Sequence, residues 1–168
     1  LGYSKFVPGV SGTALRFDGQ TTSVVRAANK APRLGDAFTV EAWAAVQAYP
    51  WTWCALVNQE KDRKAGYLFG IDPEGYFGLQ IAVGGSWVEC RSDAALPLYS
   101  WSHLAAAYDA TSGITLYRDG KPAGRKVVSG KPSFAPAADL WLGRNLTPLG
   151  LSQVVKVVAE VAYSFDGI

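Results

Sequence analysis

The chain has 168 residues, 49% of them hydrophobic and 18% charged, with 18 glycines and 9 prolines, which suits one compact, turn-rich domain spanning residues 1–168 and argues against a disordered chain. Its net charge is +2 with basic residues spread along the chain, and this argues against nucleic acid as a partner. The longest apolar stretch, 42–57, is broken by Gln47 and Pro50, so no segment is expected to span a membrane.

Short runs with a period of two residues, bounded by Gly, Pro, Asn or Asp, recur along the chain. Such alternation is typical of β-strands, and no ten-residue window before Ser152 shows the apolar spacing of a helix. The expected strands are 13–17, 22–25, 38–47, 54–59, 67–71, 76–83, 87–92, 103–108, 114–118, 125–128 and 139–143. Eleven or more short antiparallel strands in this length predict a two-sheet sandwich or a barrel.

The first long strand and the loop after it show where the core lies. Alternate residues from Phe38 to Val46 are all apolar, so we expect this face of the strand to point inward. Tyr49, Trp51 and Trp53 follow in "AYPWTW", a connecting loop. These aromatic residues either cover the core, as most tryptophans do, or line a binding site.

The stretch "YFGLQIAVGGSWVECRSD" predicts a β-hairpin. A two-residue turn at Gly84-Gly85 places Ala82 opposite Trp87 and fixes the pairing of all other residues in the two strands. One face then alternates apolar residues and belongs to the core. The other face carries the candidate ligand-binding residues Tyr76, Gln80, Trp87, Glu89 and Arg91.

An aromatic platform between hydrogen-bonding and charged side chains is suited to a sugar, whose C–H groups stack on an indole while its hydroxyls meet amide, carboxylate and guanidinium groups. Trp87 is the expected platform, and Arg144 and Asn145 are expected to contribute from a nearby edge. The alternative is a solvated polar face with Trp87 tucked under a neighbouring loop.

His103 is the only histidine, so any mechanism that needs an imidazole base must use it. It lies in "WSHLAAAYDATSGITLYRDGK", in a strand that is apolar on both faces and is expected to be central and covered on both sides. Asp119-Gly120 predicts a tight hairpin at the end of this stretch. The setting favours a structural histidine, and no strand carries the paired carboxylates of a glycosidase.

Two cysteines, Cys54 and Cys90, are too few for a disulfide framework or a zinc site. Both are expected on the core side of strands, as two free thiols or as one bridge. Asp18 and Asp166 both occur in "FDG" near the two ends of the chain and form a candidate calcium site, because paired carboxylates in glycine loops suit Ca²⁺. The alternative is that each Asp-Gly is a simple turn.

Four segments together resemble the laminin-G-like branch of the concanavalin A-like lectin and glucanase superfamily. They are "GTALRFDGQTTSVVRA", "FTVEAWAAVQ", "WSHLAAAYDATSGITLYRDGKPAG" and "DLWLGRN". The resemblance implies a two-sheet antiparallel jelly roll, a secreted or periplasmic location, and a carbohydrate-binding or protein-binding module beside a catalytic domain. Some members bind Ca²⁺. The family's last strand usually follows a phrase like "FDGI", which here ends the sequence. The tail 151–165 is ambiguous: Lys156 and Glu160 lie four residues apart, as on a helix, but the Val-rich run favours a strand.

The leading hypothesis is therefore a non-catalytic carbohydrate-binding module of a larger secreted polysaccharide-active enzyme, with an oligo- or polysaccharide and the adjacent catalytic domain as partners. A second hypothesis is a protein-binding or interdomain adhesion module. A third is a jelly-roll polysaccharide lyase or glycoside hydrolase that depends on His103.

Overall fold

The computed structural model describes residues 5–18, 22–145 and 161–163. It is an all-β antiparallel jelly-roll sandwich, as expected, with one short 3-10 helix, η1 (Ala28–Lys30). Its strands are β1 (Lys5–Pro8), β2 (Thr13–Phe17), β3 (Val24–Arg26), β4 (Ala37–Ala45), β5 (Cys54–Asn58), β6 (Tyr67–Ile71), β7 (Phe77–Val83), β8 (Ser86–Arg91), β9 (Trp101–Asp109), β10 (Gly113–Arg118), β11 (Lys121–Lys126), β12 (Leu140–Leu142) and β13 (Val161–Tyr163).

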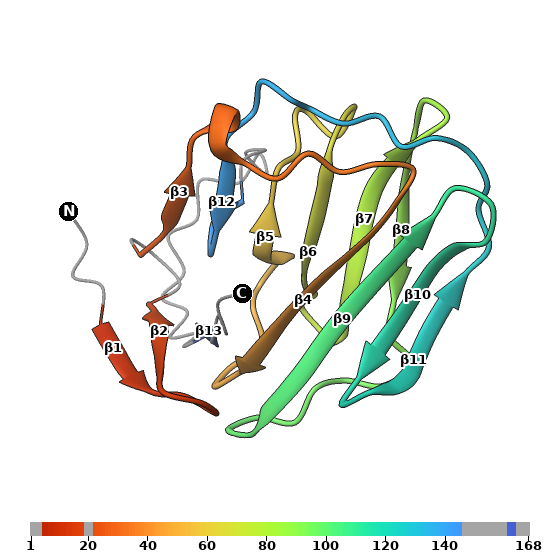
Figure 1. Cartoon of the computed structure of the whole chain (residues 1–168). Coiled ribbons are helices and arrows are strands. Elements are labelled where there is room, and N and C mark those ends of the chain that lie inside the picture. The colour runs from red at the N-terminus through yellow and green to blue at the C-terminus, as the bar shows by residue number, and fades with distance from the viewer. Residues whose placement is uncertain (1–4, 19–21, 146–160, 164–168) are drawn as a thin grey trace.

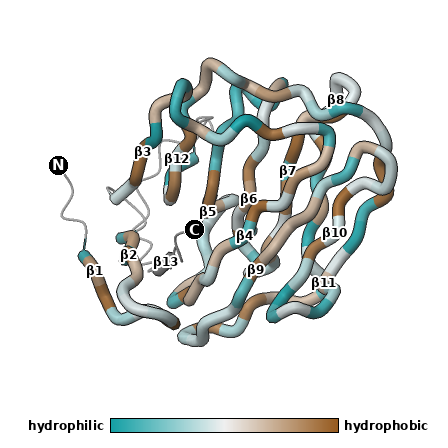
Figure 2. The backbone as a smooth tube through the Cα atoms, viewed as in Figure 1, coloured by the Kyte–Doolittle hydropathy of each residue, from teal (hydrophilic) through white to brown (hydrophobic). Residues whose placement is uncertain are grey.

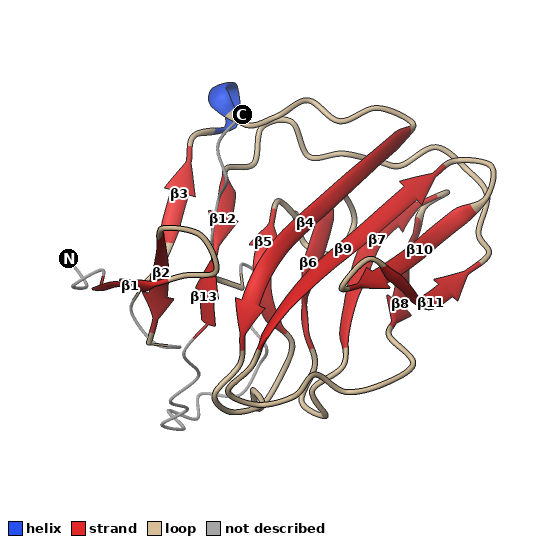
Figure 3. Cartoon of the chain, turned by 60° about the horizontal axis from the view of Figure 1, so that its bottom comes forward, coloured by secondary structure: helices blue, strands red, loops and turns tan. Residues whose placement is uncertain are grey.

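The strands form two layers (Figure 1). One layer is a six-stranded sheet in the order β3-β12-β5-β6-β7-β8. The other contains the four-stranded sheet β11-β10-β9-β4, and the small sheet β1-β2-β13 extends it because β13 lies beside β4. In Figure 3, β4 and β9 cross in front of β6 and β7. The core fills the space between the two layers.

Alternation along the strands builds this core. Phe77, Leu79 and Ile81 of β7 are fully buried and meet Leu104 and Ala106 of β9 in one hydrophobic cluster. The inward face expected for the first long strand is confirmed, since its alternate residues from 38 to 46 are buried or packed against the cluster. Figure 2 shows the corresponding hydrophobic stretches along β5, β7 and β12.

The two predicted tight turns are confirmed, and each joins the strands of a hairpin. Gly84 and Gly85 both have positive φ angles, of 57° and 81°, and the β7–β8 pairing has the expected register, with Ala82 opposite Trp87. Asp119 and Gly120, with φ angles of 51° and 76°, form the tight turn between β10 and β11. Asp119 Oδ1 also accepts a hydrogen bond from His103 N at 2.8 Å, which ties this turn to β9.

The differences from the expected strands are local. The strand β1 was not predicted, because its four residues are too few to show an alternation and end in a proline, which suits a sheet edge. The hairpin strand expected at 125–128 is shifted to Lys121–Lys126. The expected tail strand is confirmed at Val161–Tyr163, and the rest of that expectation lies outside the described residues. No helix in the described part of the chain is long and apolar enough to cross a membrane.

The two cysteines are free thiols, so the bridged alternative is wrong. They lie on β5 and β8, and β6 and β7 separate these strands in the sheet. Cys54 lies opposite Ile71 and Cys90 opposite Leu79, two core residues, which puts both thiols on the inner face as expected.

Candidate functional site

The outer face of β8 brings three of the predicted ligand-binding residues into one row. Trp87, Glu89 and Arg91 alternate along the strand and point away from the core, whereas Val88 and Cys90 between them face inward. Trp87 is half-buried, and Glu89 and Arg91 are exposed. We call Trp87, Glu89 and Arg91 the β8 strip.

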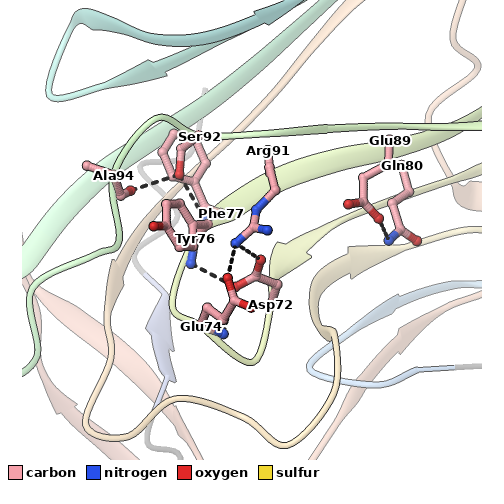
Figure 4. A network of polar contacts seen from close by, with 9 residues as sticks. All are labelled: Asp72, Glu74, Tyr76, Phe77, Gln80, Glu89, Arg91, Ser92 and Ala94. Carbon is pink, nitrogen blue, oxygen red and sulfur yellow. Dashed lines mark hydrogen bonds and ion pairs between the residues drawn. The ribbon is translucent and has the colours of Figure 1, made fainter.

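Gln80 holds two members of the strip in place from the neighbouring strand. Its Oε1 accepts a hydrogen bond from Trp87 Nε1 at 3.0 Å, and its Nε2 donates to Glu89 Oε2 at 2.7 Å (Figure 4 shows the second contact). The expectation that Gln80 lies exposed is wrong, because the side chain is only 3% exposed. Its amide is engaged by its neighbours, so its role is to orient the indole and the carboxylate.

Arg91 is oriented by the turn that precedes β7. Its Nη2 lies 2.8 Å from Asp72 Oδ2 and 2.7 Å from Glu74 Oε2, and its guanidinium stacks 4.1 Å from the centroid of the Tyr76 ring (Figure 4). Asp72 is itself fixed, because its Oδ1 accepts hydrogen bonds from the backbone N–H groups of Glu74 and Tyr76. The hydrogen bond to Glu74 is the main cause that raises the pKa of Arg91. Tyr76 therefore supports Arg91 from the turn that precedes β7.

Arg144 and Asn145 lie elsewhere, which corrects their expected place near the hairpin. They follow β12, and three strands separate β12 from β8, a distance of about 19 Å at about 4.8 Å per strand. Asn145 Oδ1 accepts a hydrogen bond from Ala55 N at 3.0 Å, and its Nδ2 donates to the Trp53 carbonyl, so it fastens backbone. Strand order depends on long-range pairing, which nearness in sequence does not reveal.

Arg144 nevertheless shares the outer face of the six-stranded sheet with the strip. Its guanidinium lies 4.5 Å from the centroid of the Trp141 ring. Trp141, Asn58, Leu68, Gln80 and Glu89 form one lateral row through the strand pairings. The middle of this row, from Asn58 to Gln80, is buried. The Trp141–Arg144 pair and the β8 strip are therefore two separate exposed features.

His103 occupies the outer face of the other layer, in the central strand β9. Its ring lies 5.2 Å from the Trp43 ring, centroid to centroid, and its Nε2 is 3.6 Å from Glu41 Oε2. Ala105, on the same face, is buried, while His103 remains partly exposed. The expected central position of the strand is confirmed, and the stacked imidazole fits the structural interpretation of this residue.

The aromatic loop after β4 divides into packed and exposed residues. Tyr49 packs against the core, and its hydroxyl donates to the Leu96 carbonyl at 2.6 Å. Trp53 is partly buried, whereas Trp51 is 69% exposed. The interpretation of the loop as a cover for the core therefore holds for Tyr49 and not for Trp51.

One groove in the structure was not predicted from the sequence. A groove of about 580 Å³ lies between residues 28–34 and 134–137, with Gln59 in its lining. We call it the rim groove. Its walls come from two connections more than a hundred residues apart, and the only signal of it in the sequence is the high proline and alanine content that the two connections share.

Comparison with known families identifies the superfamily of the chain. A family described as the concanavalin A-like lectin/glucanases superfamily, of laminin-G type, matches residues 18–154. The chain belongs to this superfamily. No curated protein sequence matches it.

Solved structures share the fold of this lectin/glucanase-superfamily domain at low sequence identity. The binding domain of Paraclostridial Mosquitocidal Protein 1 is 14% identical with a TM-score of 0.72, and the match covers 95% of this chain and 40% of that chain. Domain 4 of an extracellular arabinanase from Geobacillus stearothermophilus, solved with arabinotriose, is 15% identical with a TM-score of 0.70, covering 97% and 76%. The carbohydrate-binding module of a Ruminococcus gnavus sialidase, solved with sialyllactose, is 13% identical with a TM-score of 0.55, covering 77% and 70%.

Of the two residues of the predicted calcium site, the structure describes only Asp18. Asp18 Oδ1 accepts a hydrogen bond from Thr22 N at 2.8 Å. Asp166, its expected partner, lies outside the described residues. Within residues 5–18, 22–145 and 161–163, no three His, Cys, Asp or Glu side chains gather as metal ligands would. The pairing of Asp18 with Asp166 in a calcium site therefore stays a prediction.

Proposed function

We propose that the chain is a non-catalytic carbohydrate-binding module, secreted or periplasmic, that serves a larger polysaccharide-active enzyme through the β8 strip. The observation that carries the proposal is that every side chain of the strip is held by a partner. Gln80 holds Trp87 and Glu89, and the Asp72, Glu74 and Tyr76 cluster holds Arg91. Fixed side chains lose little conformational entropy when a ligand binds, which favours affinity.

The chemistry of the strip suits sugar hydroxyls. The indole offers a face to ring C–H groups, Glu89 offers acceptors, and the guanidinium of Arg91 offers donors in a fixed plane. The carboxylates nearest the strip, Asp72 and Glu74, are ion-paired with Arg91. This arrangement suits orientation of a ligand rather than proton transfer to it. The fold shared with the arabinanase domain solved with arabinotriose also supports the proposal.

Affinity electrophoresis in gels that contain soluble polysaccharides tests this function. The wild-type domain should be retarded by at least one polysaccharide of a neutral and acidic panel, and Trp87→Ala and Arg91→Ala should both abolish the retardation. Trp51→Ala is the matched control, because it removes an exposed indole that is not part of the strip. Circular dichroism checks that each variant is folded. Unchanged retardation of folded Trp87→Ala would show that the strip is not the site.

A protein-binding module is the second candidate, and one observation favours it. Trp51, Leu98 and Tyr99 are 69%, 39% and 74% exposed, and their two loops are joined where Tyr99 N donates to the Val46 carbonyl at 2.7 Å. Tyr99 has a positive φ of 59°, an unfavourable conformation for a tyrosine that the surrounding structure must maintain. This candidate predicts no retardation by any polysaccharide, together with loss of binding to a partner protein in Trp51→Ala.

A further inference from the structure

The rim groove lies between two long connections at one end of the sandwich. The connection from β3 to β4 and the connection from β11 to β12 run side by side along the top of Figure 1. They are fastened to each other at both ends. Asp139 Oδ1 accepts a hydrogen bond from Ala28 N at 2.8 Å, and Lys131 Nζ lies 3.0 Å from Asp36 Oδ2. The walls of the groove are therefore preorganised.

The groove has the size and the lining of a small-ligand site. Its volume of about 580 Å³ lies within the range of about 300–1,000 Å³ that is usual for such sites, and like them it is largely apolar. Phe134 forms part of one wall and is anchored in the core by its edge contact with Phe38, at 5.9 Å between ring centroids. Pro32 and Leu34 face it from the other connection. These groups can pack against the C–H face of one sugar ring.

Gln59 supplies a fixed acceptor. Its side chain is only 8% exposed, and its Nε2 donates to the Ala138 carbonyl at 3.0 Å, which sets the direction of the amide. Its Oε1 has no hydrogen-bond partner among residues 5–18, 22–145 and 161–163. In the described part of the chain, Ser102 Oγ is the buried side-chain atom that lacks a partner. Gln59 Oε1 is therefore accessible from the groove, and a sugar hydroxyl can donate a hydrogen bond to it there.

The charge in the groove is positive and uncompensated. Arg33 is the one charged residue of the described lining, and it is exposed without an ion pair to any described residue. The two acidic residues of the same connections are already engaged, Asp36 by Lys131 and Asp139 by Ala28 N. A free guanidinium beside a neutral groove favours a ligand that carries a carboxylate, because the two planar groups can form paired hydrogen bonds.

We propose that the rim groove is a second binding site, separate from the β8 strip, for one sugar residue that carries a carboxylate. Arg33 pairs with the carboxylate, Gln59 Oε1 accepts from a hydroxyl, and Phe134 packs against the ring. The choice of a sugar over another small carboxylate rests on the proposed carbohydrate-binding function. The preference for an acidic residue rests on the groove alone.

Titration of the ¹⁵N-labelled domain by nuclear magnetic resonance tests this site. The probes are galacturonic acid, glucuronic acid and N-acetylneuraminic acid, with galactose as the neutral counterpart of the first. At least one acidic sugar should cause saturable shifts of the backbone amides around the groove, residues 28–34 and 134–138. Galactose, which lacks the carboxylate, should bind the wild type at least about ten-fold more weakly than galacturonic acid does. Arg33→Gln, which lacks the guanidinium, should bind the acidic sugar at least about ten-fold more weakly than the wild type does, because either change removes one partner of a charge-assisted pair.

Trp87→Ala is the control, and it should leave the groove shifts unchanged. The inference is overturned if none of the three acids shifts these amides saturably, or if Arg33→Gln binds like the wild type. If polysaccharide retardation depends on Trp87 but no sugar binding depends on Arg33, the proposed function is supported and only the rim site is wrong. If neither Trp87-dependent retardation nor Arg33-dependent binding is observed, the proposed function and the rim site are both wrong.

Discussion

At the scale of single residues, Gln80 shows how a buried polar group can serve an exposed surface. Gln80→Met keeps the length of the side chain and removes both of its hydrogen bonds. We expect the free energy of unfolding to fall by about 1–2 kcal/mol, because Trp87 Nε1 and Glu89 Oε2 lose their partner in a partly buried site. Urea denaturation followed by tryptophan fluorescence measures the change, and polysaccharide retardation should weaken in parallel.

Glu89→Gln is the matched control, because it keeps an acceptor oxygen at the position that Gln80 Nε2 reaches. Its loss of stability should be smaller than that of Gln80→Met. Equal stability of Gln80→Met and the wild type would mean that the amide does not hold the strip. In that case the residue would contribute packing alone.

At the scale of elements, glycines let the hairpin strands approach closely. Gly78 of β7 lies opposite Gly70 on one side and Arg91 on the other. A Cβ atom added at Gly78 would lie 2.2 Å from the Cys90 carbonyl oxygen, a backbone atom that cannot turn aside. Gly78→Ala should therefore push β8 away from β7, at a cost of about 1–3 kcal/mol in unfolding free energy, and displace Arg91 from Asp72.

Gly35→Ala is the comparison for this substitution. At Gly35 the nearest atom to an added Cβ is 4.0 Å away and no positive φ is required, so stability should be unchanged or raised by about 0.4–1 kcal/mol. Thermal denaturation of both variants measures the difference. Equal stability of Gly78→Ala and Gly35→Ala would mean that the close approach of β7 and β8 does not contribute to the stability of the fold.

The same elements show what the sequence could predict. The β7–β8 register follows from Gly84-Gly85, because a two-residue turn fixes every pair beyond it, and Trp87, Glu89 and Arg91 were accordingly placed on one face. The burial of Gln80 was missed, since alternation shows a face and not what covers it. Arg144 was misplaced because the order of strands in a sheet is set by pairings between distant segments.

At the scale of the whole molecule, the two candidate sites differ in how far apart their residues lie in the sequence. The β8 strip is local, being built by one hairpin and the turn before it. The rim groove forms only where residues 28–34 and 134–137 lie side by side next to Gln59. No local sequence pattern predicts that these distant segments lie together. The hydrogen bond between Asp139 and Ala28 N joins these segments directly. The β8 strip could therefore be predicted from the sequence, and the rim groove could not.

The two thiols report on the integrity of the whole sandwich. Burial raises the pKa of Cys54 and of Cys90 to about 11, so at pH 8 roughly one thiol in a thousand is the reactive thiolate. Both lie on the core face of the six-stranded sheet. We expect Ellman's reagent to leave both thiols of the native domain unmodified at pH 8, and both to become reactive together at the urea concentration where tryptophan fluorescence changes. Rapid modification of either thiol in the native domain would contradict this.

The raised pKa values also predict how stability depends on pH. The folded domain favours the neutral thiols, whereas the unfolded chain ionises them near the ordinary pKa of 9.0. The unfolded state therefore binds fewer protons between these values, and stability must fall as pH rises. We expect the free energy of unfolding contributed by the thiols to be fully present below about pH 9 and lost progressively as pH approaches 11. Urea denaturation at a series of pH values measures this. Burial also raises the pKa of Tyr67 to about 12, which adds to the decline, and Cys90→Ala should make the decline shallower because it removes one of the groups that cause it.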